Sequence, residues 1–128
     1  MLMPACASET GVRPGLATAL QQDFSILART EELLSSEPRW DRNGTQSCPS
    51  DATQWSLFCA LMKASRDVAG DFQLRRPALN EVRGALQDIT GQSYDRRLLD
   101  FNNDPNTEFA DIRAVLDRAG ERLANKNR

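Results

Sequence analysis

Residues 51–70, DATQWSLFCALMKASRDVAG, predict the central helix of this chain. Apolar side chains recur there at helical spacing in two stripes, Trp55, Phe58, Cys59 and Met62 in one and Leu57, Leu61, Ala64 and Val68 in the other. The stripes cover more than half of the helix circumference, which is typical of a helix that other helices surround. Asp51 or Ser50 is expected to cap its start, and Gly70 to end it in a left-handed conformation.

Helical periodicity also appears on both sides of this segment. Residues 16–35 predict a long helix, which Asp23 could interrupt, with apolar positions at Leu16, Leu20, Phe24, Leu27, Ala28 and Leu34. A further helix is expected from Pro77, a residue favourable at the first helical position, to Thr90, with Gly91 as its stop. Its single apolar stripe consists of Leu79, Val82, Leu86 and Ile89.

The C-terminal part predicts a short element at residues 94–101 and, after a turn, a last helix that ends near Ala124. Asp104 or Thr107 is expected to cap this helix, with Pro105 in its first turn. Its apolar face contains Phe109, Ile112, Leu116, Ala119 and Leu123, and its polar face contains Glu108, Arg113, Asp117, Glu121 and Arg122.

These segments predict an all-α fold, a compact single-domain bundle of four to five helices. A polar loop is expected around residues 36–50, because Pro38, Gly44 and Pro49 lie there among Asp, Asn, Ser and Thr. Residues 1–14 are expected to form a flexible N-terminal arm, and residues 15–128 the helical domain.

Composition excludes several classes of function. The 128 residues contain no histidine, so catalytic triads and dyads that use an imidazole base are excluded, as are His-containing zinc sites. A net charge of −2 argues against a general nucleic-acid binder. No apolar run approaches the roughly 20 residues that span a bilayer, and the first residues lack the pattern of a secretory signal. We therefore expect a cytoplasmic protein that has no cofactor and no contact with membranes.

The cysteines are odd in number and irregularly spaced, at Cys6, Cys48 and Cys59. This pattern fits neither a disulfide framework nor a metal site, so reduced thiols are expected. Cys59 is expected to pack in the core as a small apolar residue, and Cys48, in the polar loop, to be the more reactive thiol.

Arginine supplies all but two of the sixteen basic residues, the exceptions being Lys63 and Lys126. Two arginine pairs stand out, Arg75 with Arg76 before the third helix and Arg96 with Arg97 after it, with Arg83 between them in sequence. If the short element folds back on the third helix, the pairs would form an anion-binding patch near its N-terminus. The alternative is a solvated surface on which Asp71, Asp95, Asp100 and Asp104 supply the counter-charges.

Residues 100–111 also permit a calcium-binding interpretation. Asp100, Asn102, Asp104, Asn106 and Asp111 place oxygens at the spacing of an EF-hand loop. However, Pro105 stands where that loop needs glycine, and an aspartate replaces the bidentate glutamate at its end. We favour the interpretation that needs no metal, in which these residues cap the last helix.

Several short motifs resemble a family of small uncharacterised bacterial proteins. These motifs are Trp40, Cys59-Ala60-Leu61, Asn103-Asp104-Pro105 and Leu116-Asp117-Arg118-Ala119. The resemblance covers residues 25–120 and implies no activity.

We expect a non-enzymatic module for protein–protein interaction or regulation, with a protein partner bound at Arg75, Arg76, Arg96 and Arg97. The alternative is that the same arginines bind a phosphate-containing ligand or a nucleic-acid backbone. A second alternative is an enzyme that uses carboxylates or a bound cation around Asp100, Asp104 and Asp111.

Overall fold

The computed structural model describes residues 14–92, 94 and 96–127. In that part the chain forms no strand, and its elements are α1 (Pro14–Leu33), the short 3-10 helix η1 (Glu37–Arg39), α2 (Leu57–Ala69), α3 (Pro77–Thr90), α4 (Arg97–Asn103) and α5 (Phe109–Lys126). The expected all-α fold is confirmed. The expected N-terminal arm lies outside the described residues except for Pro14, which begins α1. None of the described helices combines the length and apolar character that crossing a membrane requires.

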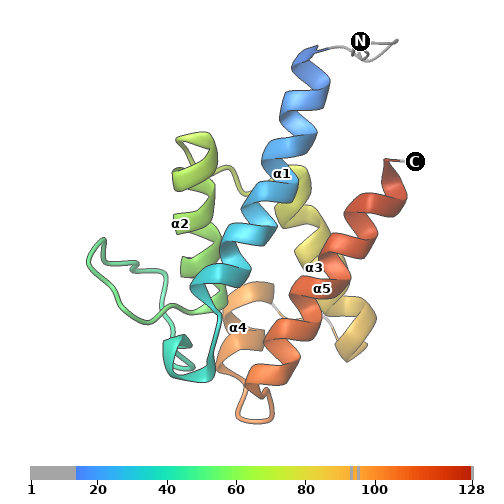
Figure 1. Ribbon diagram of the computed structural model, residues 1–128. Coiled ribbons are helices and arrows are strands. Elements are labelled where there is room, and N and C mark those ends of the chain that lie inside the picture. Colours follow the sequence, from blue (N-terminus) through green and yellow to red (C-terminus); the bar gives the residue numbers. More distant parts are fainter. Residues whose placement is uncertain (1–13, 93, 95, 128) are drawn as a thin grey trace.

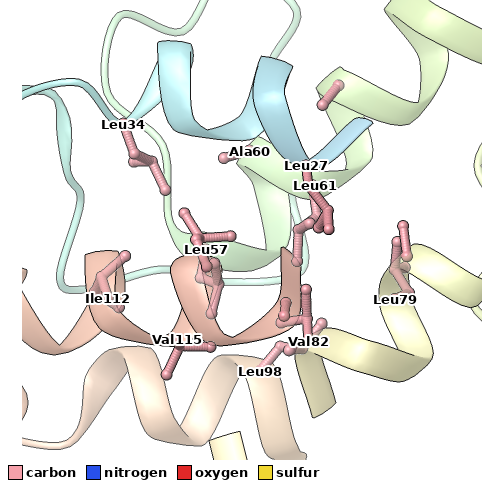
Figure 2. Close-up of a cluster of buried hydrophobic side chains, with 14 of the residues drawn as sticks. Leu27, Leu34, Leu57, Ala60, Leu61, Leu79, Val82, Leu98, Ile112 and Val115 are labelled. Atoms are coloured by element: carbon pink, nitrogen blue, oxygen red, sulfur yellow. The ribbon is translucent and has the colours of Figure 1, made fainter. Parts of the chain in front are cut away.

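The helices pack mainly in two pairs, α3 against α5 and α1 against α2, and α1 also contacts α5 and α3. The short helix α4 lies near the lower end of the bundle in Figure 1, where it contacts α2 and α3. Figure 2 shows that side chains from every helix meet in one core, among them Leu27, Leu57, Leu79, Leu98 and Val115.

Helix α2 begins later than expected. Its N-cap is Ser56, whose hydroxyl oxygen accepts the backbone N–H of the third helical residue at 3.1 Å. The expectation that Asp51 or Ser50 would cap it was wrong, because Trp55 does not enter the helix. Trp55 instead forms a parallel backbone bridge with Trp40. The start of α2 is therefore marked by the Ser56 cap and by the contact of Trp55 with Trp40, and not by Ser50 or Asp51.

The expected helix ends at the glycines are confirmed. Gly70 after α2 and Gly91 after α3 have φ angles of 84° and 67°, in the left-handed region that glycine adopts without a steric penalty. Helix α3 also begins at Pro77, as expected.

Helix α5 has a different cap from the one expected. Its N-cap is Glu108, whose backbone N–H donates to the carboxylate of Asp111 at 2.8 Å. Asp104 and Thr107 do not cap it, and Asp104 instead ends α4. Asp104 and Thr107 lie before the cap, because the turn between α4 and α5 is longer than the sequence pattern indicates.

Only part of the apolar face expected for residues 16–35 is buried, since Leu27 and Leu34 lie in the core as predicted, whereas two other members do not. Phe24 is 40% exposed and Ala28 is exposed, whereas Asp23 is buried. Asp23 does not interrupt the helix, because its Oδ1 accepts the N–H of Ala78 at 3.1 Å and Nε of Arg76 at 2.8 Å. Asp23 is thus buried because its carboxylate binds the start of α3. Apolar spacing alone predicts that this position is exposed to solvent or interrupts the helix.

Arginines of α5 join this helix to its neighbours. Arg113 donates to the carbonyl oxygens of Glu31 and Leu34 at 3.0 and 3.1 Å and so satisfies the C-terminal end of α1. Arg122 pairs with the buried Glu81 of α3 at 2.9 Å. The expected polar face of α5 therefore contacts other helices in part.

Asn102 attaches the long loop before α2 to α4. Its side chain is fully buried, and its Oδ1 accepts Nε1 of Trp40 at 2.7 Å and the backbone N–H of Leu57 at 2.9 Å. Its Nδ2 donates to the carbonyl oxygen of Asp41 at 2.9 Å. One amide thus joins three parts of the chain.

The expectation of reduced thiols at Cys48 and Cys59 was wrong, because the two residues form a disulfide with a Cα–Cα distance of 5.4 Å. The tertiary contacts of Trp40 and Asn102 fold the loop back against the start of α2, and this brings Cys48 to Cys59. The third cysteine, Cys6, lies outside the described residues.

Removing this disulfide should lower the free energy of unfolding by about 2–3 kcal/mol, because the bridge closes a short loop and restricts the unfolded chain. Urea unfolding of Cys48→Ala/Cys59→Ala and of the wild type, each with and without a thiol reductant, measures the effect. The reductant should destabilise the wild type and leave the double variant unchanged. Equal stability of the wild type and the double variant in the absence of reductant would contradict the prediction.

Candidate anion-binding pocket

A cavity of about 760 Å³ lies between α2, α3, α4 and the loop before α2. Four of its lining residues are arginines. The full lining consists of Gln46, Phe58, Leu74, Arg75, Asn80, Arg83, Arg96, Arg97, Leu98 and Leu99. Segments distant in sequence therefore bring four positive charges to one concave surface.

The environment of the pocket changes the pKa of Arg83. Burial lowers the pKa of Arg83, and the positive charges of Arg97 and Arg75 lower it further. Arginine nevertheless stays protonated at neutral pH, so the pocket keeps its charge. A bound anion would relieve the repulsion among these guanidinium groups.

The acidic residues expected as counter-charges neutralise this group only in part. Asp100 pairs with Arg96 at 3.5 Å, whereas Asp71 accepts from Gln73, and Asp104 accepts from the hydroxyl of Tyr94 at 3.3 Å. Asp95 lies outside the described residues. Across residues 14–92, 94 and 96–127, no carboxylate oxygen lies within 4.0 Å of a guanidinium nitrogen of the other three arginines of the pocket.

Arg76 does not line the pocket, although it follows Arg75 directly. Its side chain is 11% exposed and pairs with the buried Asp23 at 2.8 Å. The N-terminal end of α3 is also bound to Asp23, through the N–H of Ala78. The protein's own carboxylate thus occupies the helix end where the sequence predicts an external anion.

The structure therefore brings together Arg75, Arg96 and Arg97 from the predicted set and adds Arg83 in place of Arg76. Asn80 and Arg83 are three residues apart, a spacing that places them on one face of a helix, and this is the sequence feature that indicates Arg83. In the structure the amide of Asn80 accepts a hydrogen bond from Arg83 and donates to the carbonyl oxygen of Arg75 at 2.9 Å. Asn80 thus positions two of the arginines.

The residues proposed as calcium ligands do not form a continuous loop. Asp100 and Asn102 lie in α4 and Asp111 lies in α5. Their oxygens accept protein hydrogen bonds, from Arg96 to Asp100 at 3.0 Å and from Glu108 to Asp111 at 2.8 Å. Asp104 accepts the N–H of Asn106 at 2.9 Å. Among the described residues, no group of three or more Asp, Glu, Cys or His side chains is arranged to hold a metal ion.

Glu31 of α1 and Asp117 of α5 form a carboxylate pair between the two helices. Burial raises the pKa of Glu31, and a hydrogen bond and the negative charge of Asp117 raise it further, while Arg113 acts in the opposite direction. Neither residue lines the pocket. The pair therefore belongs to the contact between two helices and not to the candidate site.

The fold and the site define an all-α protein with an arginine-lined pocket. Residues 20–122 match the model of a family of unknown function, DUF6197, and the chain belongs to this family. All the lining residues of the pocket fall within the matched range. Comparison with curated proteins found no match, and comparison with solved structures found none.

Proposed function

We propose that this protein is a non-enzymatic binding module and that its pocket takes a phosphate-containing anion. The observation that carries the proposal is the convergence of Arg75, Arg83, Arg96 and Arg97 on one cavity of about 760 Å³. We favour a phosphate ligand over the expected protein partner, because the arginines line a concave site of the size that small ligands occupy.

The chemistry of guanidinium groups supports this choice. Each guanidinium presents a planar fork of donors that fits two oxygens of a phosphate. Many arginines elsewhere have structural partners, as Arg76, Arg113 and Arg122 do. The arginines of the pocket have fewer such partners within the described part, so their donors are available to a ligand.

The distribution of charge favours a small ligand over a long nucleic acid. The chain has a net charge of −2, and three arginines without a carboxylate partner among the described residues, Arg75, Arg83 and Arg97, share one cavity. A protein that follows a nucleic-acid backbone needs a basic stripe along its surface. We therefore expect a compact anion.

Binding of inorganic pyrophosphate, measured by calorimetric titration at low salt, tests the proposal. Arg83→Gln should weaken it about 10- to 100-fold, because a charge-assisted hydrogen bond contributes about 1.5–3 kcal/mol. Arg66→Gln is the matched control, since Arg66 is exposed on α2 and does not line the pocket. If the wild type shows neither heat nor thermal stabilisation with millimolar pyrophosphate or with any of the nucleoside diphosphates named below, the proposal is wrong and the protein-partner hypothesis gains support.

The expected cytoplasmic location stays a prediction, which the Cys48–Cys59 disulfide makes testable. Disulfides persist in oxidising compartments and are rare in the cytoplasm. A cytoplasmic protein should hold these cysteines as thiols, which rapid alkylation of freshly lysed source cells and mass spectrometry would detect. A disulfide that survives in this experiment would contradict the cytoplasmic location.

A further inference from the structure

The pocket is lined by two chemically different groups of residues. The cationic group consists of the four arginines, and the apolar group consists of Phe58, Leu74, Leu98 and Leu99. Its volume of about 760 Å³ is far larger than an inorganic phosphate needs and falls in the range of pockets for organic ligands. The ligand should therefore carry an apolar group in addition to its phosphates.

The apolar group is suited to a flat ring. Phe58 packs edge-on against Phe72, with ring centroids 5.7 Å apart and an interplanar angle of 86°, and this contact holds its orientation. Leu74 at the same pocket is 52% exposed, so a ligand can remove apolar surface from water there. Aromatic rings and guanidinium planes both stack on nucleobases.

The side-chain amide of Gln46 is available to form hydrogen bonds with the edge of such a ring. Gln46 belongs to the loop before α2, and its side-chain amide makes no hydrogen bond to another described residue. An amide offers both donors and an acceptor, as a base edge does. The amide of Asn80, by contrast, is already bonded to Arg83 and Arg75.

The charge of the pocket indicates how many phosphates the ligand carries. Arg75, Arg83 and Arg97 have no carboxylate partner within the described residues, whereas Arg96 has Asp100. A terminal phosphate carries about −1.5 to −2 charges at neutral pH, and each inner phosphate adds a further negative charge. A diphosphate therefore matches these arginines better than a monophosphate does.

From this combination we propose that the ligand is a mononucleotide, a nucleoside diphosphate with its phosphates at the arginines and its base beside Phe58 and Leu74. The inference rests on the proposed function, because it assigns the ligand class of the same pocket. It adds a second requirement, namely that the base contributes to binding.

Calorimetric titration of the wild type with ADP, GDP, CDP, UDP and inorganic pyrophosphate tests this inference. At least one nucleoside diphosphate should bind at least tenfold more tightly than pyrophosphate. Leu74→Ser should weaken binding of that nucleotide severalfold and leave pyrophosphate binding unchanged, because Leu74 is an exposed apolar residue of the pocket lining. Arg83→Gln should weaken both ligands.

The outcomes separate the two proposals. Equal binding of pyrophosphate and every nucleotide overturns the nucleotide inference and leaves the anion-binding function standing. Failure of all five ligands overturns both. If a short single-stranded oligonucleotide binds more than tenfold more tightly than any nucleoside diphosphate, the ligand is a nucleic acid and the mononucleotide inference is wrong.

Discussion

Replacing Asp23 with alanine is expected to destabilise the protein by about 3–5 kcal/mol, because it leaves a buried positive charge without its partner. Asp23 and Arg76 are 2% and 11% exposed, and their pairing distance is 2.8 Å. The variant also removes the acceptor for the N–H of Ala78 at the start of α3. Urea unfolding followed by circular dichroism would measure the change in the free energy of unfolding.

Two further variants identify the cause of this loss. Asp67→Ala is the matched control, since Asp67 pairs with Arg29 and Lys63 at the surface and should contribute about 0–1 kcal/mol. Replacing both buried partners, in Asp23→Leu/Arg76→Met, should recover part of the stability because no unpaired charge remains. A loss below about 1 kcal/mol in Asp23→Ala would show that the pair is solvated.

Replacing Asn102 with alanine is the second change with a large expected effect, about 3–5 kcal/mol. It leaves the indole N–H of Trp40, the backbone N–H of Leu57 and the carbonyl oxygen of Asp41 without their partner. A buried polar group without a partner costs about 1–3 kcal/mol, and the three contributions are not additive. Urea unfolding measures the loss, and tryptophan fluorescence should show a changed environment of Trp40.

Asn103→Ala is the control for this prediction. Asn103 is exposed, exchanges two hydrogen bonds with the backbone of Gly44 at 2.9 and 2.8 Å, and accepts one from Nδ2 of Asn102 at 2.9 Å. Water can replace these bonds, so the loss should be about 1 kcal/mol. Equal losses in the two variants would contradict the central role of Asn102.

The two buried polar groups have a further consequence for the pocket. Asp23 holds Arg76 on the side of α1, so that Arg75 remains available at the pocket. Asn102 lies in α4, the helix that also carries Arg97, and joins it to the start of α2. Both contacts thus help to assemble the walls of the candidate site.

Periodicity predicted the helical class of the fold and most helix positions, but it identified the buried face of residues 16–35 only in part, at Leu27 and Leu34. Apolar spacing places Phe24 and Ala28 in the core, yet both are exposed. The buried positions include Asp23 and Thr30. Whether a polar side chain can be buried depends on the partner that it meets, and that partner lies on another helix or in the preceding turn.

The candidate site was predictable only in part. Arginine pairs mark Arg75, Arg96 and Arg97 in the sequence, but nothing local distinguishes Arg75 from Arg76. The direction of the Arg76 side chain depends on the carboxylate of Asp23, more than 50 residues away in the chain. Arg83 joins the pocket because α4 packs near α3.

The sequence by itself determined the all-α class and the limits of α3, because Pro77 and Gly91 act on the backbone at their own positions. It also excluded histidine-dependent chemistry outright. Only the tertiary structure decided where α2 begins, that Cys48 meets Cys59, and which arginines share a pocket. Each of these depends on distances between segments far apart in the chain, and local propensity carries no information about such distances.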